Sequence, residues 1–167
     1  MPSAGTDVHA RTVLNLSLMP LHFDGAQVAE PIPVGVLGAT ESFAITSGAF
    51  DTTPVCDQIA VAWGDAGGNA NLVVYSTDAH GRLKRRGTPY TDTTYPLTGS
   101  MLVRLATGDF DLDGFDEIVM GTVGDRDGQT EVVVLHVLAT NDTLQLTLQS
   151  VGAVGRPDVA FAHVDLA

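Results

Sequence analysis

Residues 108–121 have the sequence GDFDLDGFDEIVMG, in which an acidic loop is followed at once by an apolar strand. Five of the nine residues from Asp109 to Glu117 are acidic, and the apolar run Ile-Val-Met comes directly after them. Carboxylates packed this closely repel one another. The stretch therefore needs a compensating positive charge and a fold that places an acidic loop before a buried strand.

The spacing of Asp109, Asp111 and Asp113, followed by Gly114, favours a cation site. Three carboxylates at alternate positions converge only if the chain wraps around a common centre, and a glycine permits that tight turn. Calcium takes six to eight oxygen ligands at about 2.3–2.6 Å, which suits such a loop. The compensating charge is therefore expected to be Ca²⁺, the alternative being a solvated acidic turn.

An EF-hand does not account for this loop. That motif needs a bidentate glutamate at position twelve and a helix on each side. Position twelve counted from Asp109 is Met120, and both flanking segments have the composition of strands. The last acid instead stands at position nine, Glu117.

The same pattern occurs sixty residues earlier, where SGAFD at 47–51 matches TGDFD at 107–111. An apolar burst precedes and follows each copy, and VAFAHVDLA at 159–167 begins the pattern a third time. No long segment has a helical period. A period of about sixty residues with four strand-sized bursts predicts an all-β chain built from four-stranded modules.

The expected organisation has four parts. Residues 1–41 form a partial module with an outer hairpin, 42–100 and 101–158 form two complete modules, and 159–167 form the first strand of a further one. The hairpin strands are expected at 12–19 and 27–36. The module strands are expected at 42–50, 58–63, 71–76 and 82–87, and again at 101–107, 117–123, 131–138 and 143–151.

The motif D-x-D-x-D-G-x-x-[DE], preceded by GDF, resembles the FG-GAP or VCBS-type repeat. That family builds β-propellers, as in integrin α-subunits, propeller lectins and bacterial toxin components. The resemblance implies four-stranded antiparallel blades, a Ca²⁺ loop between the first two strands of a blade, and an extracellular or cell-surface location. The ligands it implies are the side chains of Asp109, Asp111, Asp113 and Glu117 and the backbone carbonyl of Phe115. The family usually has Asp in the last place, so Asp116 is an alternative to Glu117.

The corresponding loop of the first module, between Asp51 and Asp57, is degenerate. Ala49 and Thr53 stand where the motif has carboxylates. We therefore expect no metal there, or a weakly bound one.

Composition limits the partners. The formal net charge of −12 argues against nucleic acid and anionic membranes. No apolar run is long enough to span a membrane, the N-terminal sequence lacks the features of a signal peptide, and Cys56 has no second cysteine for a disulfide.

Other polar and aromatic groups have simpler interpretations. The basic run GRLKRRG at 81–87 is expected to be a charged outer strand rather than a docking site. The segment GDRDGQTE at 124–131 is expected to be a hairpin turn, and the five histidines lack metal-ligand spacing. Four aromatic residues are candidates for stacking on sugars, although packing is the more common role: Trp63, Tyr75, Tyr90 and Tyr95.

The sequence therefore favours a Ca²⁺-stabilised propeller module for binding or assembly, without catalytic activity. A glycan-binding lectin and a subunit of a larger adhesin, toxin or propeller-scaffold enzyme are the alternatives. Two complete blades do not close a ring, because propellers have four to eight. The partner is therefore expected to be a second copy or another propeller fragment, with a glycan or protein as ligand.

Overall fold

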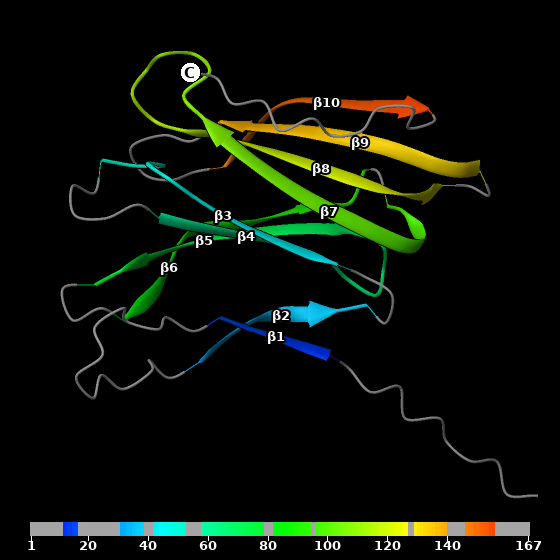
Figure 1. Ribbon diagram of the computed structural model, residues 1–167, viewed down its shortest axis with the longest axis horizontal. Coiled ribbons are helices and arrows are strands. Elements are labelled where there is room, and N and C mark those ends of the chain that lie inside the picture. Colours follow the sequence, from blue (N-terminus) through cyan, green and yellow to red (C-terminus); the bar gives the residue numbers. More distant parts are fainter. Residues whose placement is uncertain are drawn as a thin grey trace, which may run out of the picture.

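The computed structural model describes residues 12–16, 31–38, 42–52, 58–78, 82–94, 96–126, 129–139 and 146–155. These residues form β-strands and connecting loops, with no helix among them (Figure 1). The strands are β1 Thr12–Leu16, β2 Ile32–Leu37, β3 Phe43–Gly48, β4 Gln58–Gly64, β5 Ala70–Thr77, β6 Leu83–Asp92, β7 Thr98–Gly108, β8 Glu117–Arg126, β9 Gln129–Ala139 and β10 Thr147–Gly155. The prediction of an all-β chain is confirmed.

The strands pair with their sequence neighbours in three antiparallel sheets. β1 and β2 form a hairpin, β3–β6 form one four-stranded sheet in sequence order, and β7–β10 form a second. The described sheets are stacked and do not close into a ring. Antiparallel four-stranded sheets are thus observed, while closure into a propeller is not.

Several strand ends differ from the sequence prediction. β6 continues to Asp92 because the chain resumes pairing with β5 beyond an irregularity between Leu72 and Val74, close to Gly87 with φ 59°. β7 begins at Thr98, before the predicted 101, again across an irregular register. The turn at 124–131 is a hairpin in which Arg126 pairs with Gln129. The predicted strand at 159–167 and residues 27–30 lie outside the described residues.

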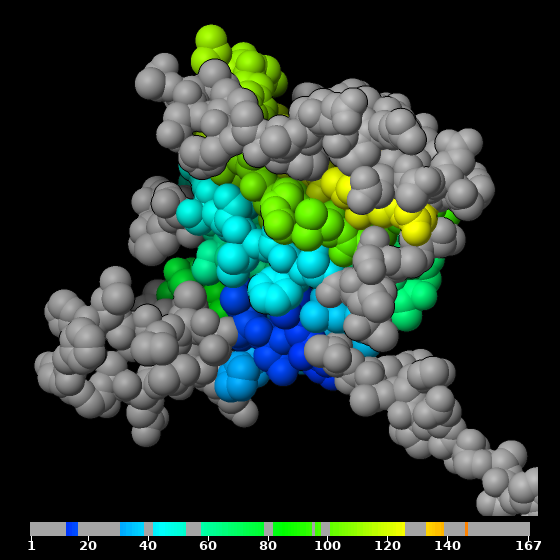
Figure 2. Space-filling model, turned by 45° about the vertical axis from the view of Figure 1, so that its right-hand side comes forward, coloured from blue at the N-terminus to red at the C-terminus, as the bar shows by residue number. Residues whose placement is uncertain are grey.

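The sheet β3–β6 is the middle layer of three (Figure 1). Figure 2 shows the same order from another side, with the blue hairpin strand, cyan β3 and green β7 following one another. Because both faces of the middle sheet are covered, nearly every residue of β4 and β5 is buried. This accounts for their consecutive apolar residues, in place of the alternation of a half-exposed strand.

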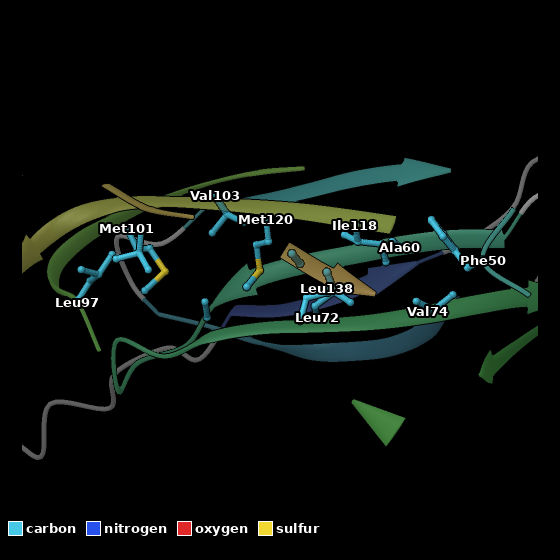
Figure 3. Packing of buried hydrophobic residues seen from close by; sticks show 13 residues of the cluster. Phe50, Ala60, Leu72, Val74, Leu97, Met101, Val103, Ile118, Met120 and Leu138 are labelled. Atoms are coloured by element: carbon cyan, nitrogen blue, oxygen red, sulfur yellow. The ribbon is translucent and has the colours of Figure 1, made fainter. Parts of the chain in front are cut away.

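Alternate residues of β4 pack into two separate hydrophobic clusters, one on each face of the strand. Val61 and Trp63 pack with side chains of the hairpin, whereas Ala60 and Ala62 belong to the larger cluster between the two four-stranded sheets. Figure 3 shows this larger cluster. Its members are Phe50, Ala60, Ala62, Ala70, Leu72, Val74, Leu97, Met101, Val103, Ile118, Met120, Val134 and Leu138.

The two four-stranded sheets stack in the same orientation. Gly48 pairs with Gln58 where β3 meets β4, and Gly108 pairs with Glu117 where β7 meets β8. In this register Met120 of β8 corresponds to Val61 of β4. Each packs towards the layer that precedes it in the chain: Val61 on the hairpin and Met120 on the middle sheet. The second sheet thus repeats the first, one layer further along the stack.

Hydrogen bonds join the first strands of the two sheets. At one end the Ser42 amide donates to the Met101 carbonyl (3.0 Å), and the Val103 amide donates to Ser42 Oγ (2.7 Å). Towards the other end Thr107 Oγ1 donates to the Ser47 carbonyl (3.0 Å). These contacts fix the position of β7, and therefore of the acidic loop that follows it. Among the described residues no helix is long and apolar enough to cross a membrane.

Candidate metal centre

The acidic loop connects β7 to β8. Two of its residues have positive φ angles, in the left-handed region of backbone conformation. Leu112 has φ 63° and Gly114 has φ 93°. A Cβ at Gly114 would meet no atom within 4 Å, so the preference for glycine comes from its backbone angle and not from crowding. These two residues reverse the chain and turn the acidic side chains towards a common centre.

Three of the predicted ligands converge. One carboxylate oxygen from each of Asp109, Asp111 and Glu117 lies within 4.8 Å of the others. Asp111 is exposed, Asp109 is half-buried, and Glu117 is only 1% exposed. The group therefore extends from the surface into the protein, with Glu117 at its base.

Only one of the two carboxylate oxygens of Glu117 has a hydrogen-bond partner. Its Oε2 accepts a hydrogen bond from the Phe110 amide (2.8 Å), whereas its buried Oε1 has no hydrogen-bond partner. Burial raises the pKa of this carboxyl above its ordinary value, and the nearby charges of Asp111 and Asp113 raise it further against the opposing backbone hydrogen bonds. A buried acceptor without a partner is costly, so the arrangement favours a cation at Oε1.

Asp113 lies beside this group without joining it. Its amide donates to Asp109 Oδ1 (3.1 Å) and Asp111 Oδ1 (3.2 Å), and its own Oδ1 accepts from the Phe115 amide (2.9 Å). The Gly114 amide donates to Asp109 Oδ2 (3.1 Å). Loop amides therefore orient the carboxylates, while the roles of Asp113 and the Phe115 carbonyl as ligands stay predictions.

Asp116, the alternative ligand to Glu117, forms hydrogen bonds with the first module. Its Oδ2 accepts from the Ala49 amide (2.7 Å), and its own amide donates to the Ala49 carbonyl (2.9 Å). Glu117 and not Asp116 belongs to the convergent carboxylates. Asp116 instead ties the acidic loop to the degenerate loop of the neighbouring sheet.

The degenerate loop contains a buried acid with a protein cation beside it. Asp51 is buried, and its Oδ2 lies 2.8 Å from Nη2 of Arg86. Asp57 and Thr53 lie outside the described residues. Within the basic run at 81–87, Arg86 on the outer strand β6 thus has an acidic partner in its own sheet, which the sequence pattern did not indicate.

A second titratable cluster lies between the two four-stranded sheets and was not predicted. His136 of β9 is fully buried, its Nδ1 is 3.3 Å from the Tyr90 hydroxyl, and its Nε2 is 3.5 Å from Asp92 Oδ2. Burial lowers the pKa of His136, against the opposing charge of Asp92. Burial also raises the pKa of Tyr90 to about 12. The only sequence signal was a histidine inside the apolar run VVVLHVL.

Comparison with family models, with curated proteins and with solved structures found no match to this chain. The resemblance to the FG-GAP repeat therefore depends on the loop residues and their spacing alone.

Proposed function

We propose that this protein is a Ca²⁺-stabilised β-sheet module, built from propeller-type blades, with a role in binding or assembly. The observation that carries the proposal is the buried Oε1 of Glu117, which lacks a hydrogen-bond partner beside Asp109 and Asp111. A cation at this point would compensate all three carboxylates and supply the missing partner.

The donor set favours calcium among the common cations. All three convergent groups are carboxylates, which bind hard cations, and none offers the nitrogen or sulfur that zinc prefers. Ca²⁺ accepts six to eight oxygens in a variable coordination geometry and so suits a loop rich in carboxylates, whereas Mg²⁺ demands a near-ideal octahedron and usually keeps several waters. The ion would fix the loop between β7 and β8 and so stabilise the blade.

The test is a calcium titration followed by calorimetry and thermal unfolding. We expect one Ca²⁺ per chain, and a melting temperature that rises with Ca²⁺ and falls with EDTA. Asp111→Asn should lose most of the heat of binding. Asp125→Asn, a charge-matched change on β8 outside the loop, should keep it. No heat of binding, together with a melting temperature that does not respond to EDTA, would overturn the proposal.

Self-association is the second part of the proposal. The face of β4 that carries Ala60 and Ala62 is covered by the next sheet. The corresponding face of the second sheet carries Val119 and Val123, which are only partly buried. Because the second sheet repeats the first, this face suits a further sheet from a second copy. Light scattering should give a mass of at least two chains, and a monodisperse monomer would contradict this part.

Glycan binding has less support from the aromatic residues. Trp63 and Tyr75 are packed under the hairpin, where neither ring can stack on a sugar. Tyr95 lies outside the described residues. Glycan-array binding is the experiment that tests the alternative lectin role.

A further inference from the structure

The described residues on either side of the degenerate loop repeat contacts seen at the acidic loop. Phe50 follows Gly48 by two residues, as Phe110 follows Gly108. The Phe50 amide donates to Gln58 Oε1 (2.6 Å), and the Phe110 amide donates to Glu117 Oε2 (2.8 Å). Gln58 and Glu117 are each the first residue of the second strand of their sheet. The two side chains therefore hold the same position and make the same backbone contact.

The remaining atoms of these two side chains differ in one decisive way. Glu117 Oε1 is buried without a hydrogen-bond partner. The corresponding Nε2 of Gln58 donates to Asp51 Oδ1 (2.5 Å). Asp51 directly follows Phe50, just as Asp111 directly follows Phe110. In the acidic loop, Glu117 Oε1 is thus left available to a cation. In the first sheet, the neutral amide of Gln58 instead donates a hydrogen bond to the Asp51 carboxylate.

The positive charge that compensates the Asp51 carboxylate comes from a side chain of the protein itself. Its side chain is 0% exposed, and Oδ2 lies 2.8 Å from Arg86 Nη2. Arg86 reaches this position from β6, where it pairs with Val74 at the edge of the irregular register. A guanidinium is always charged and forms short hydrogen bonds to carboxylates, so it can compensate a buried acid permanently.

We propose that the loop around Asp51 is a cation site of the same kind in which the Arg86 guanidinium replaces the metal ion. At the position that Glu117 holds in the second sheet, the first sheet has the neutral amide of Gln58, so this second carboxylate is absent. Of the two equivalent loops, one therefore depends on a divalent cation and the other carries its own cation. The comparison between the loops rests on the proposed function, whereas the exchange at Asp51 is a property of the first sheet alone.

The exchange is tested in EDTA by a cycle of Asp51→Asn, Arg86→Met and the double variant. Arg86→Met leaves a buried carboxylate without this cation, and it should lower the melting temperature by at least about 5 °C. The double variant, in which Asp51→Asn is added to Arg86→Met, should recover most of the lost melting temperature. Arg85→Met, an exposed arginine on the same strand, is the matched control and should change little. Equal effects of the two arginine variants, or no recovery in the double variant, would overturn the proposal.

A calcium titration tests the consequence for metal binding. The triple variant Asp109→Asn/Asp111→Asn/Glu117→Gln should bind no Ca²⁺, because the Arg86 guanidinium of β6 already lies beside Asp51 in the degenerate loop. A Ca²⁺ that persists in this variant and disappears on adding Asp51→Asn would overturn the proposal. If the wild-type chain binds no Ca²⁺ at all, the proposed function fails, and the cycle in EDTA still decides the role of Arg86.

Discussion

Asp116 and Ala49, which are 67 positions apart in the sequence, exchange two hydrogen bonds across the boundary between the two four-stranded sheets. The Ala49 amide donates to Asp116 Oδ2 (2.7 Å), and the Asp116 amide donates to the Ala49 carbonyl (2.9 Å). Asp116 is the residue before Glu117, so the base of the candidate metal centre is directly linked to the first sheet. Ordering of the acidic loop by a cation would therefore also strengthen the contact between the sheets.

Asp116→Ala should lower the free energy of unfolding by about 1 kcal/mol, because it removes the hydrogen bond that the Ala49 amide donates to the Asp116 carboxylate. Asp116→Asn keeps an oxygen acceptor and should lose less. Urea denaturation of both variants measures the difference. The number of bound Ca²⁺ ions should not change, and loss of the ion in Asp116→Asn would instead make Asp116 a ligand.

Glu117→Gln should abolish the stabilisation by Ca²⁺ without unfolding the protein. The amide keeps an acceptor for the Phe110 amide, as Gln58 does for Phe50 in the first sheet. Binding to the folded state alone stabilises by about 2.7 kcal/mol when free Ca²⁺ is about 100 times the dissociation constant, and the variant should lose this gain. In EDTA its melting temperature should equal or exceed that of the wild type, because a buried charge is gone. A variant that melts lower than wild type in EDTA would contradict this account of Glu117.

His136 should make the protein less stable in mild acid. Burial lowers its pKa in the folded state below the ordinary value of 6.5. The unfolded chain therefore binds a proton first as the pH falls, and stability is lost from about pH 6.5 down to the folded pKa. His136→Gln should flatten the dependence of the melting temperature on pH between about 7 and 5. An unchanged slope in this variant would mean that other groups cause the acid response.

Gly68→Ala should be strongly destabilising, whereas Gly67→Ala should be mild. Gly68 has φ 77°, and a Cβ there would come within 1.8 Å of the Leu97 carbonyl oxygen, which is backbone and cannot yield easily. At Gly67 the closest atom is the amide nitrogen of the Asn69 side chain at 2.9 Å, which can rotate away. Thermal unfolding of the two variants compares them directly. Similar melting temperatures would show that the loop shifts to accept the methyl group.

The sequence alone determined the strands and the acidic loop, because both depend on residues close together in the chain. Short apolar bursts separated by turns predict strands, and acids at alternate positions followed by Gly114 predict a wrapped loop. The sixty-residue repeat correctly indicated two four-stranded sheets. Three of the five predicted ligands, Asp109, Asp111 and Glu117, do converge.

Tertiary structure alone decided which distant groups meet. Arg86 reaches Asp51 from 35 positions away, and His136 meets Tyr90 from another sheet 46 positions away. Such contacts depend on strand register, on irregularities such as that between Leu72 and Val74, and on the stacking order of the layers. A shift of one residue moves a side chain to the opposite face, so local patterns predict that a residue is charged or buried without identifying its partner.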